Sequence, residues 1–487
     1  MKLLSTILNN VSLKQVAGKT DKHIEIITFN SKKVVPNALF VAVCGTQVDG
    51  HEFISKAINL GATAVLCENT PDVLIEGVTY LEVKDSSLAL GICASNFYDN
   101  PSRKLTLIGV TGTNGKTTVA TLLFDLFKEL GYSVGLLSTV ENKVNEEIIP
   151  STHTTPDAIG LNALLAQMLN KGCTHCFMEV SSHAVHQNRI SGLDFNGGVF
   201  TNITHDHLDY HKTFTNYISA KKMFFDNLPK KAFSLVNGDD RRGTVMLQNT
   251  KAGKNYFALK TPADFKGKII ENTLQGLELN INNQSVWVKL LGEFNAYNLL
   301  AVFGVASLLG EDENEVLQVL SLLEPVNGRF QQQTSPSGII AVVDYAHTPD
   351  ALENVLKTLN QFRQGVTEII TVVGCGGDRD REKRPLMASI ACKMSDRVVL
   401  TSDNPRTEEP SAILKEMNEG VTITQKAKSL TIEDRREAIQ LAVTLAKTGD
   451  IVLVAGKGHE TYQDVQGVKH HFDDKEELNK VFKLLNK

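Results

Sequence analysis

The sequence has no uninterrupted apolar run long enough to cross a lipid bilayer, because none approaches about 20 residues. Its first residues, MKLLSTILNNVSLKQ, are broken by Ser, Thr and Asn and show no small-residue cleavage site of the kind that ends a secretory signal. We therefore expect no membrane partner and a cytoplasmic location.

Cysteine is sparse as well. There are seven, an odd number, scattered through apolar runs at positions 44, 67, 93, 173, 176, 375 and 392. This pattern argues against a disulfide framework and favours reduced thiols. Cys173 and Cys176 form one C-x-x-C motif, but no second pair completes a zinc site, so we expect both in the core around a strand.

The chain carries no excess of positive charge. It has 50 Lys and Arg against 55 Asp and Glu, a net charge of −5. This balance argues against a nucleic-acid partner held by bulk electrostatics, although a local basic patch could still bind phosphate. The composition, 42% hydrophobic and 22% charged, allows a sizeable core. The length of 487 residues suggests about three domains.

Strand-like and helix-like segments alternate nearly throughout, which predicts an α/β fold with mainly parallel sheets. The breaker clusters NPSRK and LEPVNGRFQ divide the chain into expected domains of residues 1–102, 103–325 and 326–487. In the middle block, LQGLELNI and SVWVKLLG predict an antiparallel pair. The third block has strands IIAVVDY, EIITVVG, RVVLTS and DIVLVAG, and open α/β sheets bind ligands at such strand ends.

The strongest local signal is LTLIGVTGTNGKTTVATLLFDLFKELG, which predicts a strand, a glycine-rich turn and an amphipathic helix. Its glycines let backbone N–H groups surround a phosphate at the helix N-terminus. Lys116 would pair with the β- and γ-phosphates, and the Thr117 hydroxyl would hold Mg²⁺. The loop is shorter than G-x-x-x-x-G-K, because Val110 stands where that pattern has glycine. The motif predicts ATP use without saying what the ATP is for.

A second cation site is one of two interpretations of the segments that follow. Glu179 ends an expected strand, and His205, His207 and His211 come a few dozen residues later. A carboxylate and an imidazole could share a metal beside the phosphates. Taken separately, the acid could cap a helix and the histidines could lie in a solvated loop.

Two adjacent lysines stand among aromatic residues in NYISAKKMFFDNL. Lys221 shares a helical face with Tyr217, and Lys222 shares the neighbouring face with Phe225, so spacing does not choose between them. A lysine close to apolar surface has a lowered pKa, although most lone lysines keep the ammonium in water.

The segment VVLTSDNPRTEEP (398–410) ends a strand in a sharp turn, because Pro405 fixes its own φ and keeps Asn404 out of helix. Taken alone, this turn is a surface loop. Whether Arg406 recognises a ligand depends on the rest of the chain.

Many such segments occur in one order between about residues 28 and 465: GTNGKTT, HTTPD, MEVSSHAVHQNR, HDHLDYH, AKKMFF, GEFNAYNLLA, VNGRF, DYAHTPDAL, GCGGDRDREKRP, SDNPRTEEP and AGKGHE. In this series the chain resembles the Mur ligases, and among them those that add the third residue of the peptidoglycan stem peptide. The resemblance implies an N-terminal UDP-binding domain, a central ATPase domain and a C-terminal Rossmann-like domain. It implies that ATP converts the D-glutamyl side-chain carboxylate of UDP-N-acetylmuramoyl-L-alanyl-D-glutamate into an acyl phosphate. The amine of meso-2,6-diaminopimelate then displaces phosphate.

The resemblance also implies residue roles. Lys116, Glu179, His207 and Lys221 would be catalytic. Mg²⁺ would be held by Thr117, Glu179, His207 and Lys221, the last as a carbamate made with CO₂. ATP would contact Gly112, Thr113, Asn114, Gly115, Lys116, Thr117, Thr118, Asn295, Asn298, Arg329, Asp344 and His347. The UDP-substrate would contact Ser31, Thr46, Gln47, Val48, Thr154, Thr155, Ser181, Gln187 and Arg189. Diaminopimelate would contact Arg379, Asp403, Asn404, Pro405, Arg406, Gly456 and Glu460.

The chain departs from the family pattern after Ser31, where Lys32 and Lys33 replace the usual Arg and cannot offer its bidentate fork. The nearest alternatives are a sister ligase that adds L-lysine and differs at 403–406, and folylpolyglutamate synthetase, which lacks the N-terminal domain and the D-N-P-R turn. A P-loop regulator that hydrolyses ATP is the alternative from another class. Neither GCGGDR nor GKGHE matches G-x-G-x-x-G, so no nicotinamide cofactor is expected. We expect a monomer and assign His205 no role.

Overall fold

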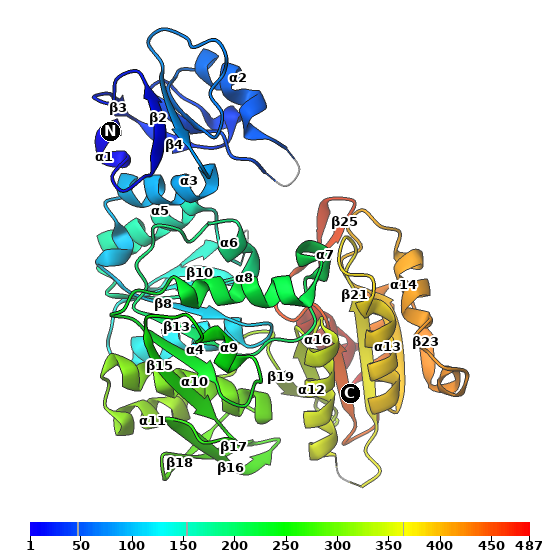
Figure 1. Cartoon of the computed structure of the whole chain (residues 1–487). Helices are drawn as coiled ribbons and strands as arrows, with labels where there is room; N and C mark the ends of the chain where they lie inside the picture. Colours follow the sequence, from blue (N-terminus) through cyan, green and yellow to red (C-terminus); the bar gives the residue numbers. More distant parts are fainter. Residues whose placement is uncertain (46–47, 152–153, 364) are drawn as a thin grey trace.

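The computed structural model describes residues 1–45, 48–151, 154–363 and 365–487. Its strands form three main sheets in successive parts of the chain. Figure 1 shows the three corresponding lobes, with the N-terminal lobe (blue) above the middle lobe (cyan to green) and the C-terminal lobe (yellow to red) beside the middle one. The boundaries expected at residues 102 and 325 stay a prediction.

The N-terminal lobe is built on a five-stranded sheet in the order β2-β7-β6-β5-β4. The β2–β7 pair is antiparallel and the others are parallel. Its strands are β1 (Lys2–Leu3), β2 (Leu13–Ala17), β3 (His23–Ile24), β4 (Ile26–Thr28), β5 (Ala38–Val41), β6 (Ala62–Cys67) and β7 (Thr79–Val83). Its helices are α1 (Leu4–Ile7), α2 (Ile54–Asn59) and α3 (Ser86–Phe97), with 3₁₀ turns η1 (Ser31–Lys33), η2 (Gly50–Phe53) and η3 (Pro101–Arg103).

The middle lobe has an eleven-stranded sheet in the order β11-β10-β9-β12-β8-β13-β14-β15-β16-β17-β18. Its strands are β8 (Thr106–Thr111), β9 (Val134–Leu137), β10 (Glu141–Val144), β11 (Glu147–Pro150), β12 (His175–Glu179), β13 (Gly197–Phe200), β14 (Phe233–Asn237), β15 (Gly253–Ala258), β16 (Phe265–Thr273), β17 (Gly276–Ile281) and β18 (Gln284–Val288). The central strands are parallel, and antiparallel strands extend both edges. The expected antiparallel pair is confirmed as β17 and β18, with Leu277 opposite Val288.

Helices cover both faces of the middle sheet and bury apolar residues against it, and α10 is buried on nearly all sides. One core joins α4 (Lys116–Glu129), α10 (Glu293–Leu309) and α11 (Glu313–Leu322) to the sheet. The core of the opposite face includes residues of α5 (Ala158–Asn170) and α8 (Phe214–Asp226). Both Cys173 and Cys176 are buried in this second core, as expected. The short helices are α6 (Ser182–His186), α7 (Leu208–His211) and α9 (Gly243–Met246).

The C-terminal lobe has a six-stranded sheet in the order β19-β20-β24-β21-β22-β23, parallel except for β19 at one edge. Its strands are β19 (Gln331–Thr334), β20 (Ile340–Asp344), β21 (Ile369–Cys375), β22 (Arg397–Ser402), β23 (Ser429–Thr431), β24 (Ile451–Ala455), and the hairpin β25 (Tyr462–Val465) and β26 (Val468–His471). One face packs on α12 (Pro349–Phe362), α13 (Lys383–Met394) and α14 (Pro410–Asn418), the other on α15 (Arg435–Leu445) and α16 (Asp474–Leu485). The 3₁₀ turn η4 (Ile423–Lys428) precedes β23.

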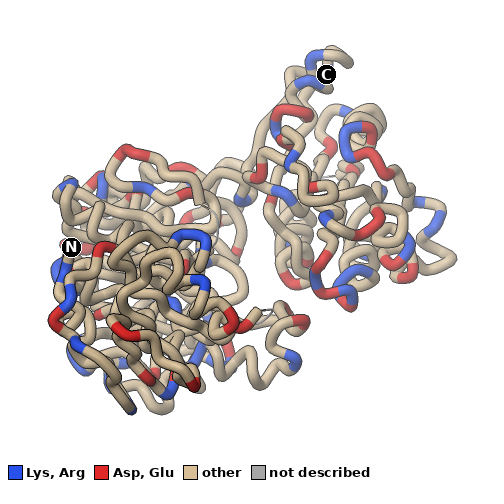
Figure 2. Tube along the Cα trace, turned by 90° about the horizontal axis from the view of Figure 1, so that it is seen from above, with Lys and Arg blue, Asp and Glu red and all other residues tan. Residues whose placement is uncertain are grey.

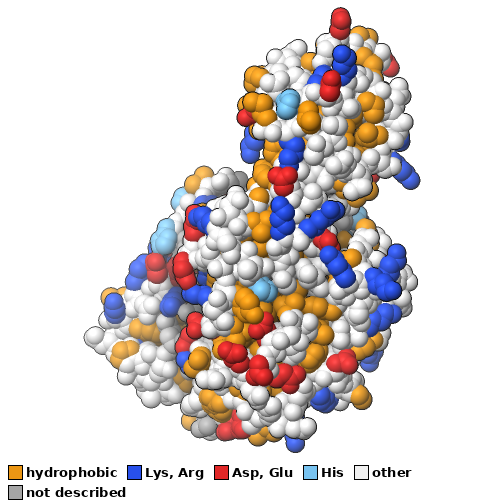
Figure 3. All heavy atoms as spheres, turned by 90° about the vertical axis from the view of Figure 1, so that its left-hand side faces the viewer, with side chains coloured by type: hydrophobic (Ala, Val, Ile, Leu, Met, Phe, Trp, Pro, Cys, Tyr) orange, Lys and Arg blue, Asp and Glu red, His pale blue; other side chains and the backbone are white. Residues whose placement is uncertain are grey.

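The carboxyl ends of strands from two sheets face one another. Glu179 ends β12 in the middle sheet, Asp344 ends β20 in the C-terminal sheet, and both line the same cavity. Seen from above, the C-terminal lobe stands to the side of the other two, and charges of both signs are interspersed (Figure 2). The face in Figure 3 shows the same mixture. In the part of the chain that the structure describes, no helix combines the length and apolarity needed to span a membrane.

Candidate active site

A cavity of about 1120 Å³ lies between the middle and C-terminal lobes. It brings together most of the residues expected to contact ATP, metal and the third substrate, including Lys116, Glu179, Asp344, Arg379 and Arg406. On the UDP-substrate side, Thr154, Thr155, Ser181 and Arg189 also line it. Four expected residues do not line the cavity: Gly112, Asn295, Pro405 and Gln187. Two expected UDP-substrate residues, Ser31 and Val48, belong to the N-terminal lobe. Thr46 and Gln47 lie outside the described residues.

The compact phosphate loop connects β8 to α4, and its glycines are required by close packing. Gly115, with φ +85°, precedes the first residue of α4, and a Cβ there would lie 2.5 Å from Asn298 Oδ1. A Cβ on Gly112 would lie 1.9 Å from Thr201 Oγ1. Glycine is therefore favoured at both positions, and the loop leads into the N-terminus of α4, where backbone N–H groups can bind an anion.

Lys116 folds back onto its own loop. Its Nζ donates to the carbonyl oxygens of Gly112, at 3.0 Å, and Thr113, at 2.8 Å. Burial lowers the pKa of this lysine, and Glu179 and Asp206 oppose that effect. The ammonium is therefore held where the phosphates of a bound nucleotide would lie.

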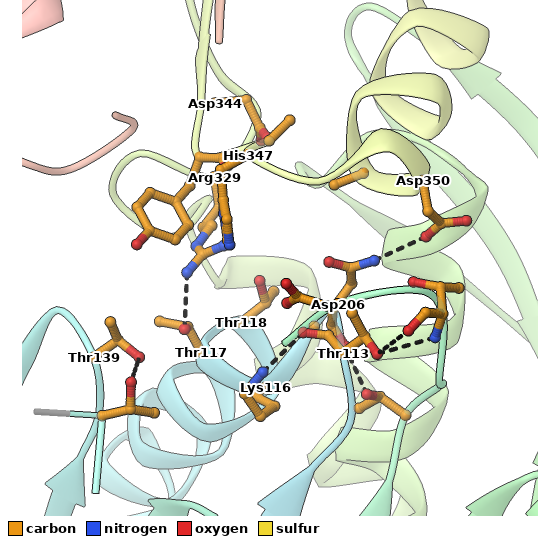
Figure 4. A pocket seen from close by; sticks show the side chains of 18 of the residues that line it. Thr113, Lys116, Thr117, Thr118, Thr139, Asp206, Arg329, Asp344, His347 and Asp350 are labelled. Carbon is orange, nitrogen blue, oxygen red and sulfur yellow. Dashed lines mark hydrogen bonds between the residues drawn. The ribbon is translucent and has the colours of Figure 1, made fainter. Parts of the chain in front are cut away.

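Glu179 and Thr117 form a pair of oxygen donors beside the loop. Thr117 Oγ1 donates to Glu179 Oε1 at 2.8 Å and accepts from Arg329 Nη2 at 2.9 Å, a contact drawn in Figure 4. Glu179 Oε1 also accepts from the Thr139 N–H at 2.7 Å, whereas the buried Oε2 has no hydrogen-bond partner among the described residues. A buried carboxylate oxygen without a partner, next to a hydroxyl, suits a hard divalent cation. Ser181, not Glu179, caps the following helix, α6.

His207 lies beside Asp206, a residue that the sequence interpretation missed. His207 Nε2 is 3.4 Å from Asp206 Oδ2. Burial lowers the pKa of His207 to about 3, so its imidazole is neutral at pH 7 and can offer a lone pair. Burial opposes ionisation of Asp206, but His207, followed by His347 and Lys383 of the C-terminal lobe, outweighs it and lowers its pKa. The sequence signal that could have identified Asp206 is its place between two histidines in HDHLDYH.

The structure separates the two lysines of α8. Lys221 is 1% exposed, and its Nζ donates to the Gly112 carbonyl at 2.7 Å while lying 4.7 Å from the centre of the Tyr217 ring. Burial, followed by repulsion from Lys116, lowers the pKa of Lys221 well below its usual value. Lys222 instead pairs with Asp226 one turn away, at 2.6 Å. The neutral amine that carbamate formation requires is therefore favoured at Lys221.

The expected nucleotide residues come from both lobes. Asn298 Nδ2 donates to Asn295 Oδ1 at 3.0 Å, and Asn295 Nδ2 donates to the Leu291 carbonyl at 2.8 Å. Asp344 Oδ2 accepts from the Phe330 N–H at 2.6 Å, and burial raises the pKa of Asp344 to about 6. Across the lobes, Asn114 Nδ2 donates to Asp350 Oδ2 at 2.8 Å (Figure 4).

His205 contacts the C-terminal lobe, and His347 belongs to that lobe. His205 Nε2 is 3.3 Å from Asp380 Oδ2, so this histidine, expected to have no role, meets the opposite lobe. His347 Nδ1 lies 2.9 Å from the Tyr345 carbonyl. Burial lowers the pKa of His347 to about 4. Lys383 Nζ donates to the carbonyl of His347 at 3.0 Å.

The turn at 403–406 lies against the other strand ends of the C-terminal sheet. Asn404 Nδ2 donates to Glu460 Oε2 at 2.7 Å, and the fully buried Lys457, which the sequence interpretation missed, donates to Asn404 Oδ1 at 3.1 Å. A Cβ on Gly456 would lie 2.6 Å from Asp403 Oδ2. Arg406, with φ +51°, donates through Nη1 to the Gly377 carbonyl at 2.7 Å.

The UDP-substrate residues of the middle lobe are joined by hydrogen bonds. Arg189 donates to Gln187 Oε1 at 2.9 and 2.6 Å and to the Thr155 carbonyl at 2.8 Å. Thr155 Oγ1 donates to the Glu179 carbonyl at 2.8 Å, and the hydroxyls of Thr139 and Thr154 lie 3.1 Å apart. This group therefore connects directly with the Glu179 strand end.

Similarity to known proteins agrees with this geometry. The chain is 58% identical to UDP-N-acetylmuramoyl-L-alanyl-D-glutamate–2,6-diaminopimelate ligase of Cytophaga hutchinsonii over 99% of this chain and 100% of the relative. The ligase of the same name from Clostridioides difficile is 42% identical over 98% of each chain. The chain belongs to the Mur ligase family. Three Mur ligase models match it: "Mur ligase family, catalytic domain" at 23–98, "Mur ligase middle domain" at 110–306 and "Mur ligase, glutamate ligase domain" at 328–458.

A solved Mur ligase structure has the same fold over its whole length. The structure, of a UDP-N-acetylmuramoyl-L-alanyl-D-glutamate–2,6-diaminopimelate ligase, is 31% identical with a TM-score of 0.70 and matches 100% of this chain and 99% of the other. The expected three-domain α/β architecture, the family resemblance and the assignment to the ligases are thus confirmed. The roles of individual residues stay predictions.

Proposed function

We propose that this Mur ligase uses ATP to add meso-2,6-diaminopimelate to the D-Glu side-chain carboxylate of UDP-N-acetylmuramoyl-L-alanyl-D-glutamate, in peptidoglycan synthesis. One observation carries the proposal: residues of the phosphate loop, Arg379 and Arg406 line a single cavity. The names of the relatives that match the full chain agree with it. We further propose that the protein acts as a cytoplasmic monomer.

The first chemical step joins two anions, so the site must neutralise charge and align the reactants. The D-glutamyl carboxylate attacks the γ-phosphorus of ATP and ADP leaves, with Lys116 stabilising the transferring phosphoryl group. Arg329, which reaches Thr117 from the C-terminal lobe, adds a second positive charge at the same place. The amine of diaminopimelate then attacks the acyl carbon, phosphate leaves, and the amine loses a proton.

Asn295 and Asn298 would contact adenine, and Asp344 the ribose.

Thr117, Glu179 and His207 would hold Mg²⁺, and the unpartnered Glu179 Oε2 fits that assignment. When bound, Mg²⁺ neutralises phosphate charge. Lys221 would carry a CO₂-derived carbamate, which replaces an ammonium by an anion suited to Mg²⁺. Its burial and its closeness to Lys116 favour the neutral amine that reacts with CO₂.

The third substrate distinguishes this proposal from the L-lysine alternative. Diaminopimelate has a carboxylate on its far carbon where lysine has none, and Arg406 can pair with it bidentately. Lysine would leave that guanidinium without a carboxylate, which costs affinity. A folylpolyglutamate synthetase-like activity remains the more distant alternative.

The test is an amino-acid panel in a phosphate-release assay with ATP and UDP-N-acetylmuramoyl-L-alanyl-D-glutamate. We expect release that requires both the UDP-substrate and an amino acid, with diaminopimelate preferred. Preference for L-lysine would contradict the substrate assignment. ATP turnover independent of both substrates would contradict the ligase activity and favour a P-loop regulator.

A further inference from the structure

Arg384 is a fully buried arginine at the start of α13, outside the set of residues expected to contact substrate. Its guanidinium holds two glutamates. Nη1 donates to Glu408 Oε2 at 3.0 Å and to Glu416 Oε2 at 2.6 Å, and Nη2 donates to Glu408 Oε1 at 2.8 Å. Glu408 comes two residues after Arg406, so Arg384 holds the far side of the same turn.

The carboxylate of Glu408 is fully occupied by these contacts. Besides the two bonds from Arg384, its Oε1 accepts from the Asp378 N–H at 2.6 Å, and its Oε2 lies 3.1 Å from the exposed Arg381. The bonds from Arg384 lower the pKa of Glu408 to about 2, so its charge is present at any working pH. These contacts hold the negative charge of Glu408 away from the expected binding site for the substrate carboxylate.

Arg379 and Arg406, which line the cavity, differ from Arg384 because they have no carboxylate partner among the described residues. Among the described residues, neither Arg379 nor Arg406 forms an ion pair, and the hydrogen bonds of their guanidinium groups go to backbone carbonyls. Burial and repulsion from Arg406 lower the pKa of Arg379, so the two positive charges lie near each other. An anion bound there would relieve that repulsion.

We propose that Arg384 is a specificity-determining positioning residue: by sequestering Glu408, it keeps Arg406 and Arg379 unpaired and available to the distal carboxylate of the third substrate. This inference rests on the proposed function. Without Arg384, Glu408 would keep only the solvent-exposed Arg381 as a cationic partner. Arg406, two residues away, would then compete for the Glu408 carboxylate. Pairing between them would neutralise the site that diaminopimelate must enter.

A double-mutant comparison tests the proposal through KM. In Arg384→Met we expect KM for diaminopimelate to rise about tenfold or more, the scale of one charge-assisted hydrogen bond. KM for ATP and for the UDP-substrate should change by less than about threefold. Adding Glu408→Gln should then lower KM for diaminopimelate again, because the competing charge is gone while the shape is kept. Glu408→Gln alone should have little effect, since Arg384 still pairs with Glu416.

Arg381 offers a matched control, because it contacts the same two glutamates from the solvent side and is 65% exposed. We expect Arg381→Gln to leave all three KM values close to wild type. As a second readout, any residual activity with L-lysine, which has no distal carboxylate, should not fall in Arg384→Met. The ratio of kcat/KM for diaminopimelate to that for lysine should therefore drop.

Two results would overturn the inference. One is a double variant no better than Arg384→Met, and the other is an equal rise of KM for ATP, which would indicate general damage to the fold. If Arg384→Met does not fold, Arg384→Lys, which keeps a charge without the fork, should show a smaller rise that Glu408→Gln again reduces. The wild-type enzyme in the same assay distinguishes failure of the proposed function from failure of this inference. Preference of the wild type for lysine would contradict the proposed function. Normal turnover of diaminopimelate by the wild type, with no recovery of KM in the double variant, would contradict this inference alone.

Discussion

Lys116 and Lys221 donate to the same oxygen, the carbonyl of Gly112, at 3.0 and 2.7 Å. They come from helices more than a hundred residues apart in the chain, and burial together with repulsion from Lys116 disfavours the charge of Lys221. Under the proposed function Lys116 keeps its ammonium for the phosphates, and conversion of Lys221 to an anion would relieve the conflict. This relationship motivates the first prediction.

Lys221→Ala should reduce activity by about 100-fold or more, because loss of a metal-ligand group exceeds the ~10–100-fold effect of its outer partners. Small carboxylates such as formate or acetate should restore part of the activity by standing in for the carbamate. The matched control is Lys222→Ala, which removes only a pair with Asp226 and should stay near wild-type activity. Unimpaired Lys221→Ala would remove the carbamate role.

Arg406→Ala should raise KM for diaminopimelate by about 10- to 100-fold, since hydrogen bonds to charged groups contribute about 1.5–3 kcal/mol. ATP affinity should hardly change. Arg406→Lys keeps the charge but not the bidentate fork, so an intermediate KM is expected. Steady-state kinetics with each substrate varied in turn checks this, and equal losses for diaminopimelate and ATP would mean that the turn is only structural.

Nucleotide binding should depend on pH through Asp344. Burial raises the pKa of Asp344 to about 6, and the ionised form is the stronger acceptor for ribose hydroxyls. Affinity for ADP should therefore increase as pH rises through about 6. Asp344→Asn should bind more weakly and lose this component of the pH dependence. Calorimetry of both proteins at each pH cancels the titration of the nucleotide itself, and identical pH profiles would contradict the assignment.

The raised pKa of Asp344 affects folding stability in the opposite direction: stability falls, rather than rises, with pH. The folded protein holds the Asp344 proton up to about pH 6, whereas an unfolded aspartate releases it near its ordinary value of 3.8. The folded state therefore binds more protons in this window, and the contribution of Asp344 to stability falls as pH rises from about 4 to 6. Asp344→Asn should flatten that part of the stability profile in thermal unfolding, relative to wild type.

Arg435 and Asp474 form a fully buried ion pair between α15 and α16, with Nε–Oδ1 and Nη2–Oδ2 distances of 2.7 Å. Asp474→Ala should destabilise the C-terminal lobe by about 3–5 kcal/mol, because it leaves a buried guanidinium uncompensated. Replacing both residues, as Arg435→Met with Asp474→Leu, should cost much less. Urea unfolding followed by a probe in this lobe checks the comparison, and a double variant as unstable as Asp474→Ala would contradict the reasoning.

The sequence determined the alternation of strands and helices, the phosphate loop and the turn at 403–406, because each depends on local spacing, glycine or proline. It left Lys221 and Lys222 equal by helical position, and only the resemblance to a family separated them. The contact of His205 with Asp380 and the influence of His347 and Lys383 on Asp206 could not be read from the 205–206 segment, because Asp380, His347 and Lys383 lie in the other lobe.

The tertiary structure decided which groups are buried and which charges face one another. Lys221 lies beneath the phosphate loop while Lys222 reaches Asp226. Arg384 pairs with Glu408, whereas Arg406 has no ion pair among the described residues. Burial and charge pairing depend on distances between segments far apart in the chain, which no local spacing specifies. The sequence by itself therefore determined the chemistry available to this Mur ligase, and the packing of its lobes decided which side chains are placed to carry it out.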